Sequence, residues 1–170
     1  MNACKSFGIR CLMALLVCGS CFTAGVSAEE PARSRLGDLI VTEFAGTFED
    51  IRDQLVFSIE QKGLAVSNTA AVGDMLKRTR SDVGGSRDLY GNAEIVQFCS
   101  ASTAHGSTQV DAHLVGLCPY SVAVYTLSGT PGRVYVSYRT LLMPEISPDV
   151  RAALERSEAL VAGVVKGISQ

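Results

Sequence analysis

The residues of this chain with the most specific chemistry are two cysteines, Cys99 and Cys118. The other four of its six cysteines lie within the first 28 residues, which have the pattern of a cleaved export signal. Outside the cytoplasm two remaining cysteines favour a disulfide, unless the strands that flank them are parallel neighbours and hold them apart. Two buried free thiols and a reactive thiolate at Cys99 are the alternatives that the sequence leaves open.

Both histidines of the chain, His105 and His113, fall between these cysteines. Two sulfurs and two imidazoles suit copper(I) or zinc, but spacings of six, eight and five residues lack the close ligand pairs of structural zinc sites. His105 is also near enough in sequence to lower the pKa of Cys99 in a nucleophilic site, with Asp111 as a possible orienting group. Two surface histidines without a ligand role are the simpler interpretation.

A predicted hairpin near residues 120–139 contains several tyrosines and arginines. Tyr120 and Arg139 are the candidates there for contact with a ligand. Alternation along a strand places Tyr135 and Tyr138 on opposite faces, and such tyrosines more often cover a sheet than bind a ligand.

The first 28 residues predict export to the periplasm or secretion. Lys5 and Arg10 precede an apolar run, and small residues end at Ala28. The run is too short and too interrupted for a stable transmembrane segment. Cys21 is an alternative attachment point for a lipid anchor, because small residues precede it.

Charge and motifs exclude several classes of function. Without residues 1–28 the chain has 13 basic and 17 acidic residues, a net charge of −4, which argues against nucleic acid as a partner. The basic cluster at Lys77, Arg78 and Arg80 fits a solvated helix end. No phosphate loop, nucleophile elbow, dinucleotide fingerprint or Cys-x-x-Cys-His haem motif follows the signal. The sequence therefore indicates no particular cofactor, and the cofactor is unknown.

Helical and strand patterns predict a single compact α+β domain, with a mixed or antiparallel sheet covered by helices. Thr47 caps a helix that ends at Gly63, and Ser147-Pro148-Asp149 begins the last one. The apolar stripe of this last helix is expected to dock on the sheet; as a partner surface it would instead support a homodimer. Strands are expected near residues 39–44, 64–69 and 93–99, with a hairpin of 120–127 and 133–139 and a second helix at 72–80.

This order of elements resembles the family called domain of unknown function 302 over roughly residues 40–140. The segments that carry the likeness are the capped helix and the next strand, then residues 91–101, Cys118-Pro119-Tyr120 with residues 122–125, and residues 133–139. Many members have glycine, asparagine and proline where this chain has Phe98-Cys99-Ser100, so it resembles a cysteine-containing, exported branch. The family implies a compact α+β fold and no established activity.

The predicted organisation is a signal peptide at 1–28, a flexible lead-in at 29–38, the domain at 39–142 and an added C-terminal helix at 143–170. The predicted function is an exported accessory or binding protein whose Cys/His region handles a small ligand, a metal or a sulfur species. The alternative is a thiol-based redox or sulfur-transfer enzyme that uses Cys99 and a redox partner.

Overall fold

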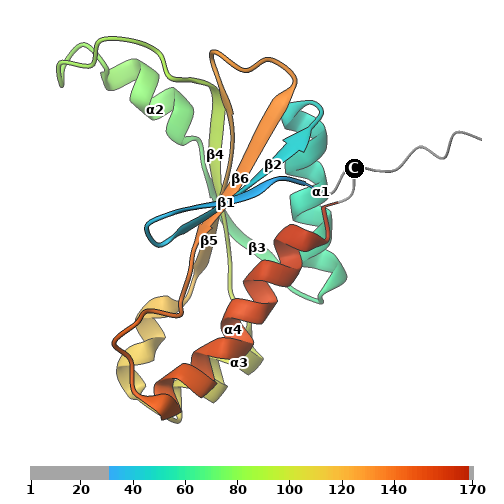
Figure 1. Ribbon diagram of the computed structural model, residues 1–170, viewed down its shortest axis with the longest axis vertical. Helices are drawn as coiled ribbons and strands as arrows, with labels where there is room; N and C mark the ends of the chain where they lie inside the picture. Colours follow the sequence, from blue (N-terminus) through green and yellow to red (C-terminus); the bar gives the residue numbers. More distant parts are fainter. Residues whose placement is uncertain (1–30, 169–170) are drawn as a thin grey trace, which may run out of the picture.

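The computed structural model describes residues 31–168, which fold around one six-stranded sheet (Figure 1). All neighbouring strands are antiparallel, in the order β1-β2-β6-β5-β4-β3. The predicted α+β class is confirmed. The strands are β1 (Arg33–Leu36), β2 (Leu39–Ala45), β3 (Val66–Ala70), β4 (Tyr90–Phe98), β5 (Tyr120–Leu127) and β6 (Arg133–Arg139). The helices are α1 (Phe48–Gln61), α2 (Val72–Thr79), α3 (Ala101–Thr108), α4 (Pro148–Lys166) and the 3-10 helix η1 (Ala112–Leu117).

The edge strand β1 corrects the prediction of a flexible lead-in at 29–38. Residues Arg33–Leu36 pair with β2, and Gly37, at φ +58°, makes the turn between the two strands. All four residues of β1 are exposed, so the strand carries no apolar alternation that a sequence reading could detect. Exposed charges are typical of an edge strand, where they discourage pairing with other chains.

Helix α1 forms as its sequence predicts. The Thr47 side chain accepts a hydrogen bond from the Asp50 backbone N–H at 3.2 Å, which satisfies one of the free amides at the helix start. Ile51, Leu55 and Ile59 lie on one face and are buried against the sheet. Gly63 follows the helix at φ +70°, a conformation that glycine adopts without steric cost.

The core lies between one face of the sheet and the helices α1 and α4, which Figure 1 shows on the same side. Alternate residues of the central strands are directed into it, as the two-residue period of a strand requires. Val161, Val164 and Val165 of α4 are buried in the same core, so docking of this stripe on the domain is confirmed. The sheet residues of the core include Phe44, Val96, Phe98, Val122, Val124, Val134 and Val136.

Helix α2 lies apart from this packing and contributes no buried residue. It approaches the sheet at Gly73, where a Cβ atom would lie 2.8 Å from the backbone nitrogen of Ala93 on β4. Glycine is therefore required for this close contact. Within residues 31–168, no helix is both long and apolar enough to cross a bilayer.

Candidate functional site

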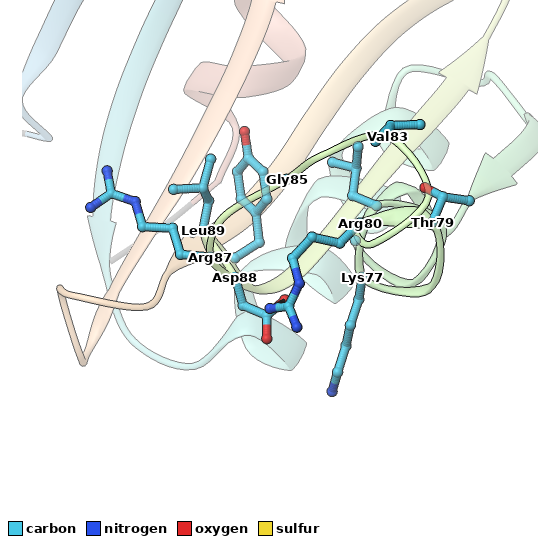
Figure 2. Close-up of a pocket in the computed structure, with 11 residues that line it drawn as sticks. Lys77, Thr79, Arg80, Val83, Gly85, Arg87, Asp88 and Leu89 are labelled. Atoms are coloured by element: carbon cyan, nitrogen blue, oxygen red, sulfur yellow. Dashed lines mark ion pairs between the residues drawn. The ribbon is translucent and has the colours of Figure 1, made fainter.

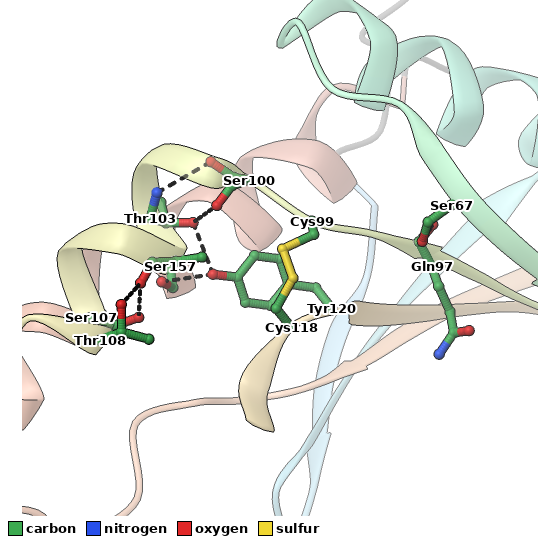
Figure 3. The surroundings of a disulfide bond; sticks show 11 residues. Ser67, Gln97, Cys99, Ser100, Thr103, Ser107, Thr108, Cys118, Tyr120 and Ser157 are labelled. Atoms are coloured by element: carbon green, nitrogen blue, oxygen red, sulfur yellow. Dashed lines mark hydrogen bonds between the residues drawn. A yellow bond between two sulfur atoms is a disulfide. The ribbon is translucent and has the colours of Figure 1, made fainter. Parts of the chain in front are cut away.

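The structure joins Cys99 and Cys118 in a disulfide, with Cα atoms 5.6 Å apart (Figure 3). Cys99 directly follows β4, and Cys118 stands two residues before β5. Because these strands are antiparallel and Phe98 pairs with Tyr120, the end of one lies beside the start of the other. The disulfide thus closes the base of the segment that contains α3 and η1.

The two histidines do not join this disulfide in a common site. His105 on α3 and His113 on η1 are both exposed. In the part of the chain that the structure describes, no three His, Cys, Asp or Glu side chains gather in a way that could hold a metal ion. The metal site expected from Cys99, Cys118, His105 and His113 is not assembled, because the two sulfurs are bonded to each other.

Asp111 is the N-cap of η1, where its Oδ1 accepts a hydrogen bond from the His113 backbone N–H at 2.8 Å.

A buried network of hydroxyl groups lies next to the disulfide. The Tyr120 hydroxyl donates to Ser157 Oγ at 2.9 Å and lies 2.9 Å from Thr103 Oγ1 (Figure 3). The network therefore connects β5 to α4 and α3. Ser157 is 1% exposed, and its bond to Tyr120 satisfies a polar group that would otherwise be costly to bury. This network was missed in the sequence, where Ser157 is one small residue in an apolar stripe.

Tyr120 and Arg139, the two predicted ligand contacts, lie apart in the structure. Tyr120 is 5% exposed and its hydroxyl is occupied within the protein. Arg139 is exposed at the end of β6. Val122 lies opposite Tyr138 in the pairing of β5 and β6, so Tyr120, two residues before Val122, shares the face of Tyr138, and Arg139 lies on the other face of the sheet. The structure therefore does not bring them together.

The Tyr138 hydroxyl links the edge strand β1 to the last helix, α4, by hydrogen bonds. Its hydroxyl accepts a hydrogen bond from Arg33 Nη2 at 3.0 Å and donates to Glu158 Oε1 at 3.4 Å, and Glu158 Oε2 accepts from the Leu141 backbone N–H at 2.8 Å. Burial raises the pKa of the Tyr138 phenol above its ordinary value, and the nearby Glu158 carboxylate raises it further. Burial also raises the pKa of Tyr125 on the opposite face of the sheet.

These two phenols predict a loss of stability in alkali. Both stay neutral in the folded protein at a pH where they ionise in the unfolded chain, so the unfolded state loses protons first. We expect the free energy of unfolding to be insensitive to these groups below about pH 10 and to fall as pH rises through their raised folded-state pKa values. Urea unfolding at about pH 9 and about pH 11 measures this decline. A Tyr125→Phe/Tyr138→Phe variant with the same decline as the parent would refute the assignment.

A pocket, here called the α2–β4 pocket, lies between α2, the loop that follows it and the start of β4 (Figure 2). It encloses about 180 Å³. Its polar lining includes Lys77, Arg80, Arg87 and Asp88, and Arg80 Nη1 lies 2.7 Å from Asp88 Oδ1 in an ion pair. Lys77 and Arg80, two members of the basic cluster that the sequence assigns to a solvated helix end, thus border a pocket. Its apolar lining includes Leu76, Val83, Leu89 and Tyr90.

Tyr90 also begins a row of three aromatic rings across the sheet face opposite the core. Its ring contacts that of Tyr125 edge to face, with centroids 5.8 Å apart. The Tyr125 ring stacks on that of Tyr135 at 5.5 Å. Tyr90 therefore links the pocket to a row of aromatic rings on β4, β5 and β6.

Comparison with known proteins places the chain in a family of undefined activity. The family model described as "Domain of unknown function DUF302" matches residues 40–162. A solved structure, "Crystal structure of uncharacterized conserved protein DUF302 from Bacillus stearothermophilus", superimposes with a TM-score of 0.64 at 14% sequence identity. The match covers 79% of this chain and 100% of that chain, and it shows a shared fold. No curated protein matches the chain.

The extent of the family match corrects the predicted limit of the shared part. It includes most of α4 (Pro148–Lys166), which lies outside the shared part predicted from the sequence. The physical reason is that the apolar stripe of α4 completes the core, so the domain needs this helix. With more than half of its length matched, the chain belongs to the DUF302 family.

Proposed function

We propose that this protein is exported and acts as a non-catalytic accessory or binding protein, as a member of a cysteine-containing branch of its family. The signal pattern of residues 1–28 supports export, although these residues lie outside the part that the structure describes. The Cys99–Cys118 disulfide is compatible with it, because such bonds persist in oxidising compartments. Localisation in the periplasm or the medium follows from the same argument.

The observation that carries the non-catalytic role is the state of the cysteines. With both sulfurs in one bond, neither is present as the thiolate that a nucleophile or a metal ligand requires. The neighbouring hydroxyl network joins Tyr120 to Thr103 and to Ser157, and within residues 31–168 no hydrogen bond links these three hydroxyls to a histidine or a carboxylate. A hydroxyl without an adjacent base is a weak nucleophile. The α2–β4 pocket offers a place for a small ligand without such chemistry.

A test of this role is native mass spectrometry of the protein purified from the periplasm. A small molecule that leaves the protein on denaturation is the result expected for a non-covalent binding protein. A protein that carries nothing, and whose thiols react rapidly after mild reduction, would contradict the proposal.

One observation favours the alternative of a thiol-based redox or sulfur-transfer enzyme. Cys99 stands directly before Ser100, the N-cap of α3, and the positive end of a helix lowers the pKa of a nearby thiol. After reduction, alkylation of a low-pKa Cys99 would remain fast at about pH 6, whereas an ordinary thiol would be largely unreactive there. The Cys99→Ser and Cys118→Ser variants identify which sulfur reacts.

A further inference from the structure

Three apolar side chains that are unusually exposed meet at the α2–β4 pocket. Leu76 is 43% exposed, Leu89 is 49% exposed and Val83 is 78% exposed, and all three line it. Apolar side chains scattered singly on a surface are ordinary, but a group of them around a cavity is typical of a binding site. The apolar lining therefore favours a ligand with an apolar part.

The charged side chains of the pocket add a second requirement. Arg80 is neutralised by Asp88 at 2.7 Å, whereas no carboxylate within residues 31–168 lies within ion-pair distance of Lys77 or Arg87. Figure 2 shows Lys77 and Arg87 extending on either side of the Arg80–Asp88 pair. The lining thus has two uncompensated positive charges in a chain whose net charge is −2. This excess attracts an anion.

The size and the surroundings of the pocket limit the shape of the ligand. A volume of about 180 Å³ is below the roughly 300–1,000 Å³ of pockets that enclose drug-sized molecules. A larger ligand must therefore extend out of the pocket. The Tyr90 ring lies in the lining and continues into the row of Tyr125 and Tyr135, which offers an aromatic surface for a planar group.

From these features we infer that the α2–β4 pocket binds an amphipathic organic anion. The positive charges of Lys77 and Arg87, on either side of the Arg80–Asp88 pair, attract the anionic group, and the aromatic or apolar part lies against Leu89 and Tyr90. This inference rests on the proposed binding function and names its ligand class. It assigns no ligand to the Cys/His end of the domain.

Two fluorescent probes separate the charged from the apolar contribution. 8-Anilinonaphthalene-1-sulfonate is an aromatic anion, and N-phenyl-1-naphthylamine is the same ring system without the sulfonate. We expect Lys77→Gln/Arg87→Gln to weaken binding of the sulfonate about tenfold or more, because it removes charge-assisted contacts. Binding of the neutral probe should change less than about twofold, since its apolar contacts remain.

The matched control removes two positive charges elsewhere. Arg78→Gln/Lys166→Gln alters exposed residues outside the lining, one of them on the same helix α2. It should change sulfonate binding less than about twofold, because neither side chain lines the pocket and salt weakens the effect of exposed charges that do not contact the ligand. Leu89→Asn should weaken binding of both probes, since Leu89 supplies apolar contact without being part of the core. Equal melting temperatures establish that the variants are folded.

Two results would overturn the inference: sulfonate binding that Lys77→Gln/Arg87→Gln leaves intact, and equal weakening by both double variants. The second result would mean that only the general field of the protein attracts the probe. If a molecule that copurifies with the parent also remains bound to Lys77→Gln/Arg87→Gln, the assignment of the pocket fails while the proposed binding function stands.

Discussion

Loss of the Cys99–Cys118 disulfide is expected to lower the free energy of unfolding by about 3 kcal/mol, since the bond closes a loop of about 20 residues in the unfolded chain. For a domain of this size the melting temperature should fall by on the order of 10 °C. The segment closed by the bond holds α3 and η1, which contribute no residue to the hydrophobic core. The disulfide and the Tyr120 network therefore provide much of what holds this segment against the sheet.

Calorimetry of the parent and of Cys99→Ala/Cys118→Ala, each with and without reductant, measures the contribution of the disulfide. Reductant should lower the melting temperature of the parent to that of the variant and should leave the variant unchanged. A parent that melts at the same temperature in both conditions, with its thiols shown to be free after reduction, would refute the stabilising role.

Truncation of Phe98 should have an even larger effect on stability. Phe98 is 0% exposed at the end of β4, and its ring contacts that of Tyr120 edge to face with centroids 5.8 Å apart. Phe98→Ala leaves a cavity between the sheet and the helices, and such changes cost about 3–5 kcal/mol. Typical domains have only about 5–15 kcal/mol of total stability, so a large part of the margin would be lost. Urea unfolding with the disulfide intact measures the cost.

Phe57→Ala is the matched control for this substitution. Phe57 lies on α1 but is 58% exposed, so the same truncation removes little buried surface. Its cost should stay within about 0.5 kcal/mol. Similar costs for the two variants would mean that Phe98 is not packed as the structure has it.

Local signals predicted the elements that depend on local chemistry. The Thr47 cap, the Gly63 stop and the Ser147-Pro148 start fix α1 and α4, because each supplies a backbone conformation or a hydrogen bond at its own position. The hairpin of β5 and β6 has the predicted bounds, since its alternation and its turn are both contained in one stretch. The edge strand β1 was missed because none of its residues is buried.

The candidate site was harder to predict because it depends on contacts between distant segments. The proximity of Cys99 and Cys118 follows from the antiparallel pairing of β4 and β5, which the sequence left open between mixed and antiparallel arrangements. The pocket combines α2 with the start of β4, and Lys77 alone looks like any solvated helical lysine. The spacing of residues along the sequence does not show that Cys99 lies near Cys118, or that α2 lies near the start of β4.

The central claim, an exported domain closed by a disulfide, is tested most directly by the intact mass of the protein from the periplasm, with and without reductant and an alkylating agent. The predicted mass is that of residues 29–170 less two hydrogens, with two alkyl groups added only after reduction. A lipid-sized increment on a chain that begins at Cys21 would establish the anchored alternative. A chain that retains its first 28 residues, or one that takes up two alkyl groups without reductant, would contradict the claim.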